Sequence, residues 1–277
     1  MKQKTYSWVS GDKKKIFAHC WRPEEDTDKT ILFVHGLGEH SGRYQSWAEL
    51  FTQNGYNFLA IDLRGHGKSE GKRGHARSLS FLLDDIDLMY DKAVRLFPDS
   101  RLILYGHSMG GNLVLNHVIR RNRPIDALIV TSPWLRLYNE PSYVTRLMAA
   151  MGKRIVPSLT IKTPLRPEQL SHDPEVGRKY VNDALVHNKI SLRLFFELYE
   201  SGIFALRNIY KINHPFLLMH GTADTITSPR ASKNYVLNTS KRTRLKLWDG
   251  QYHELHNEFI KDEVHHYIVD WLNEYKL

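Results

Sequence analysis

The stretch LILYGHSMGG, residues 102–111, decides the fold of this chain. Four apolar residues that suit a buried strand lead into Gly-His-Ser-Met-Gly, and residues with helical periodicity follow. A Gly-x-Ser-x-Gly motif between a strand and a helix is typical of the sharp turn that presents a nucleophilic serine. The helix that follows directs its first N–H groups at the space above that serine. The sequence therefore predicts Ser108 as a nucleophile and the N–H of Met109 as an oxyanion donor.

Short apolar runs alternate with helical segments along most of the 277 residues. Two β-rich runs at 5–10 and 15–21 open the chain around a Gly-Asp turn, and further apolar runs lie at 31–36, 56–62, 102–106, 127–132, 215–221 and 244–250. Helical patterns occupy 42–55, 78–97, 111–121, 231–238 and 258–275. This alternation predicts one α/β domain over residues 1–277, with a mostly parallel central sheet and helices on both faces.

Residues 134–205 interrupt this alternation and are called the cap below. The segment shows helical patterns and no convincing strand, so we expect a helical insertion over the carboxyl edge of the sheet, where ligands bind in such folds. One helical stripe carries Val144, Leu147, Met148, Met151 and Ile155. The stripe fits packing on the core or docking on a membrane, where Arg146, Lys153 and Arg154 would meet anionic head groups.

A serine nucleophile needs a base and an acid that orients it, and in this architecture the chain order is Ser, then Asp or Glu, then His. Asp224 follows the apolar run 215–221, and His253 lies in the loop after the last run. These two residues are the predicted partners of Ser108. His256 is a rival for the base and Asp249 for the acid, although Asp249 is too close to His253 in sequence to approach its ring easily.

A second oxyanion donor is expected in the loop after the run 31–34. Leu37 lies there between Gly36 and Gly38, which allow its N–H to turn toward the site. His35 in the same loop could serve as a base. A side chain that bonds to the backbone and stabilises the loop is the preferred interpretation of this histidine.

Several other functions are disfavoured by the sequence. The Gly-Lys-Ser at 67–69 lacks the earlier glycine of a phosphate-binding loop, and His-Glu-Leu-His at 253–256 has the wrong spacing for a zinc helix, so we expect no nucleotide, no metal and no cofactor. The net charge of +9 lies in short clusters without interleaved aromatic residues, which argues against nucleic acid. The single Cys20, the lack of a signal-like start and the lack of a long apolar run favour the cytoplasm, with peripheral membrane contact.

Further blocks accompany the serine motif, namely HGLGEHSGRY at 35–44, DLRGHGKS at 62–69, LSHDPEV at 170–176 and YHELH at 252–256. With GHSMGG at 106–111, they resemble the monoacylglycerol lipase and lysophospholipase branch of the α/β-hydrolase superfamily, which includes serine aminopeptidase-like enzymes. The resemblance runs from Lys15 to the last helix and implies the α/β-hydrolase fold. It implies the same triad and oxyanion residues, and a polar cluster around a glycerol head group formed by Glu39, Arg43 and His256. A Glu39–Arg43 ion pair that only fixes the loop is the alternative.

The expected activity is hydrolysis of carboxylic esters of lipids through an acyl-enzyme, most specifically of monoacylglycerol to glycerol and fatty acid. A lysophospholipase, a general carboxylesterase and a prolyl-type aminopeptidase are alternatives on the same scaffold. The aminopeptidase would need acidic groups in the cap, for which Glu168, Asp173 and Glu175 are candidates. A non-catalytic ligand-binding relative is a more remote alternative, and the sequence leaves the oligomeric state open.

Overall fold

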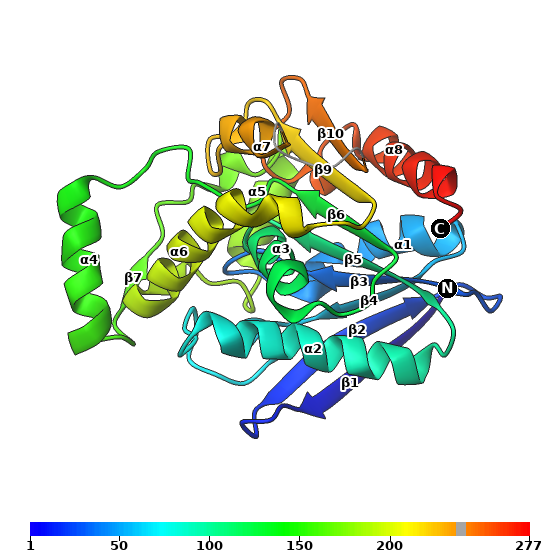
Figure 1. Cartoon of the computed structure of the whole chain (residues 1–277), viewed down its shortest axis with the longest axis horizontal. Coiled ribbons are helices and arrows are strands. Elements are labelled where there is room, and N and C mark those ends of the chain that lie inside the picture. The colour runs from blue at the N-terminus through cyan, green and yellow to red at the C-terminus, as the bar shows by residue number, and fades with distance from the viewer. Residues whose placement is uncertain (237–241) are drawn as a thin grey trace.

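The structure is a computed structural model that describes residues 1–236 and 242–277 (Figure 1). It confirms the predicted alternation of strands and helices around a central sheet. The side chains of residues 144, 145, 148 and 149 and the end of the predicted helix 231–238 lie outside the described residues. The sheet has eight described strands in the order β1-β2-β4-β3-β5-β6-β9-β10. Its bounds are β1 (Lys2–Val9), β2 (Lys15–Arg22), β3 (Lys29–Val34), β4 (Asn57–Ile61), β5 (Arg101–His107), β6 (Ala127–Thr131), β9 (Phe216–Gly221) and β10 (Thr243–Trp248).

The sheet is mostly parallel, as predicted. Strands β1 and β2 pair antiparallel with each other, β2 pairs antiparallel with β4, and every pair from β4 to β10 is parallel. Carboxyl ends of parallel strands meet at one edge, so the loops that follow β3, β5, β9 and β10 converge there. These loops hold the predicted site residues.

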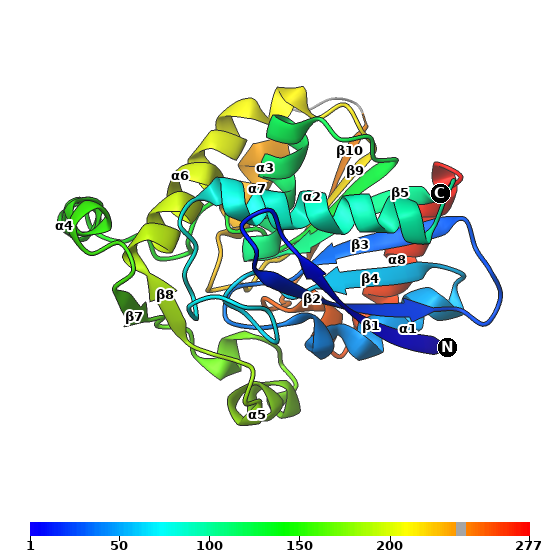
Figure 2. The ribbon, with the colours of Figure 1, turned by 90° about the horizontal axis from the view of Figure 1, so that it is seen from below.

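Helices cover both faces of the sheet (Figure 2). One layer holds α2 (Leu79–Leu96), α3 (Met109–Arg121), α6 (Leu192–Asn208) and α7 (Pro229–Val236), and the other holds α1 (Gln45–Gln53) and α8 (Lys261–Glu274). Alternate residues of one strand point to opposite layers: Leu32 and Val34 pack in the first, whereas Ile31 and Phe33 pack in the second. A strand buried on both faces must be continuously apolar, which explains the runs in the sequence.

The cap contains α4 (Tyr143–Ile155), β7 (Thr160–Lys162), α5 (Pro174–Asn182) and β8 (Lys189–Ser191), followed by α6. Strands β7 and β8 form an antiparallel pair, so the prediction that the cap contains no strand is wrong. Each strand has three residues, which is too short for an alternating pattern to be visible. Helix α6 continues to Asn208, and its buried face packs against α3. The extent of the cap, 134–205, stays a prediction.

Helix α4 projects away from the sheet at one side of the molecule (Figure 1). Leu147, Met151 and Ile155 from the predicted apolar stripe are 48%, 54% and 79% exposed, whereas the side chains of Val144 and Met148 lie outside the described residues. The described part of the stripe therefore faces solvent and does not pack on the core. Among the described residues, no helix combines the length and apolar character needed to cross a bilayer.

Candidate active site

The turn between β5 and α3 carries Ser108 in a conformation that few residues adopt. Its φ of 54° and ψ of −115° lie outside the usual regions for a residue with a side chain. The turn can be this tight because Gly110 has no Cβ, which would lie 2.0 Å from the carbonyl oxygen of Val34. Strain of this kind is often stored at functional sites. The backbone thus presents Ser108 at the carboxyl edge of the sheet.

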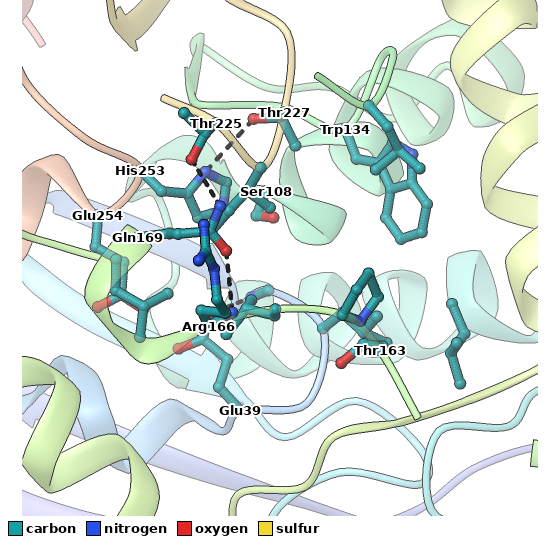
Figure 3. Close-up of a pocket in the computed structure, with 18 of the residues that line it drawn as sticks. Glu39, Ser108, Trp134, Thr163, Arg166, Gln169, Thr225, Thr227, His253 and Glu254 are labelled. Carbon is teal, nitrogen blue, oxygen red and sulfur yellow. Dashed lines mark hydrogen bonds between the residues drawn. The ribbon is translucent and has the colours of Figure 1, made fainter. Parts of the chain in front are cut away.

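Asp224 and His253 meet at the same edge, from the loops after β9 and β10. Nδ1 of His253 lies 2.6 Å from Oδ2 of Asp224. The side chain of His253 lines the same pocket as Ser108, and Figure 3 shows both residues in that pocket. The structure therefore brings together the three residues predicted as a triad.

The Asp224 carboxylate is held as an anion by five hydrogen-bonding groups from four residues. Oδ1 accepts hydrogen bonds from the backbone N–H groups of Ile226 and Thr227, and Oδ2 lies 3.0 Å from Nε2 of His220 and 2.9 Å from the hydroxyl of Thr227. Burial raises the pKa of Asp224, but His253 and His220 outweigh burial and hold this pKa far below its ordinary value. Sequence reasoning missed His220 and Thr227, although both lie within four residues of Asp224.

The ionised Asp224 fixes the tautomer of His253. A carboxylate can only accept, so Nδ1 of His253 carries the proton and Nε2 remains available as a base. Burial lowers the pKa of His253, and the Asp224 carboxylate more than offsets burial, so the pKa lies above its ordinary value of 6.5. The backbone oxygen of His253 accepts a hydrogen bond from Ser132, which anchors the loop.

The two rival residues lie elsewhere. Asp249 is exposed and accepts a hydrogen bond from Thr222. His256 is buried, and its ring stacks on Tyr44 with a centroid distance of 4.6 Å. The geometry therefore favours Asp224 and His253 over both rivals as partners of Ser108.

Residues 35–40, called the oxyanion loop below, pass beside Ser108 and include Leu37 in the pocket wall. Nε2 of His35 accepts from the N–H of Leu63, so Nδ1 carries the proton and donates to the carbonyl of Gly36 at 2.7 Å. That carbonyl belongs to the peptide unit whose N–H is that of Leu37, and this unit is planar. His35 thus fixes the plane of the predicted donor, and its contacts are those of the loop-stabilising interpretation. Met109 begins α3, so its N–H has no acceptor within the helix.

The predicted polar cluster is a buried ion-pair network. Arg43 makes two hydrogen bonds of 2.9 Å to Glu254 and pairs with Glu39, which also accepts from Tyr44 and the N–H of Gly36. Glu39 and Glu254 line the pocket, whereas Arg43 and His256 are not among its lining residues. These contacts match the alternative to glycerol binding, in which the Glu39–Arg43 ion pair fixes the loop. Contact of the cluster with glycerol stays a prediction.

The charges in this network follow from its contacts. Burial raises the pKa of Glu254, but Arg43 outweighs burial and brings this pKa to about 2. Burial lowers the pKa of His256 to about 4, so this ring is neutral near pH 7. Glu254 was missed by sequence reasoning because its partner Arg43 lies 211 residues away.

The pocket above these residues has a volume of about 350 Å³, within the usual range for small-molecule sites. Its polar end contains Ser108, His253, Glu39 and Glu254, and much of the remaining lining comes from the cap, including residues 161–166, Ile190 and Phe195. The apolar part of the wall is formed by Leu37, Trp134, Leu137, Ile161, Leu165, Leu170, Ile190, Phe195 and Ile226. Further polar side chains in the wall are those of Asn139, Lys162, Thr163, Arg166, Gln169, Thr225 and Thr227. Such a pocket suits an acyl chain whose polar end lies at Ser108. Among the described residues, no group of His, Cys, Asp and Glu is arranged to hold a metal ion.

Comparison with known proteins agrees with this geometry. Residues 25–259 match the family described as serine aminopeptidase, S33. The chain belongs to this family of α/β-hydrolases. An abhydrolase domain-containing protein of Dictyostelium discoideum is 37% identical over 96% of the chain, which spans 28% of that relative's length.

Two relatives of this S33 hydrolase are monoacylglycerol lipases. One, from Mycolicibacterium smegmatis, is 30% identical, and the match covers 93% of the chain and 94% of the relative. The other is the crystal structure of the enzyme from Paleococcus ferrophilus, with a TM-score of 0.86, 32% identity and coverage of 94% and 99%. The fold and the predicted family are thus confirmed, and the chain is a serine ester hydrolase of the monoacylglycerol lipase and esterase group.

Proposed function

We propose that this hydrolase cleaves monoacylglycerols to glycerol and fatty acid through an acyl-enzyme on Ser108. The observation that carries the proposal is the 2.6 Å contact between Asp224 and His253 beside Ser108, at the polar end of an apolar pocket. The contact orients a histidine base, and the pocket suits a single acyl chain. The two monoacylglycerol lipases that are about as long as this chain support the substrate class.

The reaction has two steps. Nε2 of His253 removes the Ser108 proton as Oγ attacks the ester carbonyl, and the N–H groups of Leu37 and Met109 stabilise the oxyanion. His253 then gives the proton to glycerol as the carbon–oxygen bond breaks, which leaves the acyl group on Ser108. In the second step His253 takes a proton from water, the resulting hydroxide attacks the acyl-enzyme, and Ser108 recovers its proton as fatty acid departs. Asp224 stabilises the protonated ring in both steps.

The acidic groups of the site argue against an aminopeptidase. A free amino terminus requires a carboxylate without another cation, yet Glu39 and Glu254 both bind Arg43. The three acidic cap residues considered above do not line the described pocket. Asp173 accepts from the N–H of Glu175 at the start of α5, and Glu175 pairs with Arg178. An ester substrate is therefore favoured over a peptide.

The test is a panel of substrates: a monoacylglycerol, a lysophospholipid, a diacylglycerol, a short p-nitrophenyl ester and an amino-acid anilide, each with wild type and Ser108→Ala. Selective release of fatty acid from the monoacylglycerol, lost in the variant, is expected. Activity on short esters alone would reduce the assignment to a general carboxylesterase. Faster cleavage of the anilide would contradict the proposal, and no turnover at all would favour the ligand-binding alternative.

We also propose that the cap touches a lipid surface through α4. Leu147, Met151 and Ile155 are exposed along this helix, and the following residues Leu159 and Ile161 are 53% and 48% exposed. Arg154 in the last turn of α4 adds positive charge next to the apolar residues, whereas Lys153 pairs with Glu200 at 3.0 Å. Exposed apolar residues beside cations are typical of peripheral binding to anionic lipid. Co-sedimentation with anionic vesicles tests this contact.

A further inference from the structure

The cap touches the oxyanion loop through its backbone. The N–H of His187 donates to the carbonyl oxygen of Gly38 at 2.8 Å. Gly38 has a φ of +80°, and a Cβ at this position would lie 2.2 Å from the carbonyl oxygen of His187. The two segments therefore approach so closely that only glycine fits in the loop. Gly38 directly follows Leu37, the predicted oxyanion donor.

A side-chain contact joins the same two segments. Nδ1 of His40 accepts from the N–H of Gly42, so Nε2 carries a proton and donates to Oδ2 of Asp183 at 2.8 Å. The other oxygen of Asp183 accepts from the N–H of Leu185 and fixes the carboxylate. Residues 183–187, called the cap seat below, therefore hold the oxyanion loop at both Gly38 and His40.

The cap seat is itself held by the loop after β4. Nε2 of His187 lies 3.1 Å from the carbonyl oxygen of Gly65, and the N–H of Ser191, just beyond the seat, donates to Gly74 at 2.8 Å. The ring of His187 also lies 4.9 Å from that of the buried His66. The cap seat therefore contacts two loops of the core, the oxyanion loop and the loop after β4. The apolar face of α4, in another part of the cap, is exposed to solvent.

We infer that the cap seat is a positioning element for the oxyanion site. The contacts that hold the cap seat against the oxyanion loop also align the N–H of Leu37. This role rests on the proposed function. Oxyanion donors act at about 2.7–3.1 Å from the developing charge, and removal of one donor costs roughly 100- to 1,000-fold in kcat. His35 fixes the plane of the Leu37 peptide, and Gly38 is the next residue. His35 and the seat thus hold the loop on the two sides of Leu37, and a shift of the seat is transmitted to this residue whatever the length of the acyl chain.

Two variants with matched controls test this role. Gly38→Ala introduces a Cβ against the seat, and Gly55→Ala is its control because Gly55 has φ +78° with nothing within 4 Å of a Cβ. Asp183→Ala removes the His40 contact, and its control is Glu175→Ala, another acidic cap residue that pairs with Arg178. We measure kcat and KM on p-nitrophenyl acetate and on a long-chain monoacylglycerol, with thermal unfolding of each variant.

We expect kcat to fall roughly 10- to 100-fold for Gly38→Ala on both substrates and about tenfold for Asp183→Ala. KM for the acetate ester should stay within about twofold, and the two controls should keep both parameters. An unchanged kcat on acetate with a higher KM for the long-chain ester would overturn the inference, since the seat would then only form a wall for substrate. If Gly38→Ala fails to fold, the kcat and KM of Asp183→Ala on the two substrates test the inference alone. A wild type that cleaves neither ester would instead refute the proposed function.

Discussion

At the scale of single residues, His253 responds to two opposing influences, burial and the Asp224 carboxylate, and the carboxylate prevails. The ring acts as a base only when neutral, and its pKa is raised above 6.5. We therefore predict that kcat/KM for a short ester falls as pH drops through a midpoint above 6.5.

The Asp224→Asn variant isolates the effect of the carboxylate on the pKa of His253. Loss of the carboxylate should move the acidic midpoint of kcat/KM to lower pH and reduce kcat by about four orders of magnitude, the cost of the same change in the serine protease triad. A pH–rate profile of both proteins measures the midpoints. An acidic midpoint at the same pH in the variant would show that Asp224 does not set the pKa of His253.

Another residue-scale prediction concerns Arg43, whose guanidinium compensates Glu39 and Glu254. Arg43→Met leaves two buried carboxylates without a cation, and we expect a loss of about 3–5 kcal/mol in the free energy of unfolding. Urea unfolding at pH 7 measures this loss. A matched surface change, Arg178→Met, should cost less than about 1 kcal/mol because its ion pair is exposed. Equal losses in the two variants would contradict the account.

The same network predicts how stability depends on pH. The pKa of Glu254 is about 2 in the folded chain and 4.5 ordinarily, so its ionised form stabilises the fold above pH 4.5. This contribution is lost as pH falls from 4.5 toward 2. The difference in free energy of unfolding between wild type and Glu254→Gln should therefore shrink over this interval. A difference that grows with acid would contradict the cited pKa.

The sequence predicted the positions of Ser108, Asp224 and His253 because chain order and strand ends constrain them. It missed His220 and Glu254, since only the folded chain shows which loops meet. The role of Arg43 was left between glycerol binding and an ion pair for the same reason. Spacing identifies residues near a turn, but it does not indicate partners 211 residues apart.

At the scale of elements, the β5–α3 turn depends on close approach to β3. A Cβ on Gly110 would lie 2.0 Å from the Val34 carbonyl oxygen, so α3 would have to move away from the sheet. We predict that Gly110→Ala lowers the free energy of unfolding by about 1–3 kcal/mol or more. Gly11→Ala, where nothing lies within 4 Å, is the control for urea unfolding. Equal stability of the two variants would refute the steric argument.

Long elements could be predicted because their period is visible. Helix α2 was expected at 78–97 and spans Leu79–Leu96, and the apolar strands of the sheet appear as continuous runs. Strands β7 and β8 were missed because three residues carry no period. Helix α6 runs to Asn208, past the expected edge of the cap, and no local pattern indicates its contacts with α3 at Leu198 and Ser201.

At the scale of the whole molecule, the exposed face of α4 and the net charge of +9 favour attachment to anionic lipid. We predict that Met151→Ser with Ile155→Ser weakens co-sedimentation with anionic vesicles and slows hydrolysis of vesicle-bound monoacylglycerol. Hydrolysis of a soluble short ester should be unchanged. Val94→Ser, at an exposed position of α2, is the matched control. If the Met151→Ser, Ile155→Ser variant sediments with vesicles as well as wild type and the control do, α4 is excluded as the contact.

The central claim is that Ser108 carries the acyl group of a monoacylglycerol during turnover. Its most direct test mixes protein with excess monoacylglycerol, quenches in acid within the first turnover and maps the acyl adduct by peptide mass spectrometry. We predict an adduct on the peptide that contains Ser108, and loss of both adduct and fatty-acid release in Ser108→Ala. An adduct on another residue, or undiminished release of fatty acid by Ser108→Ala, would contradict the account.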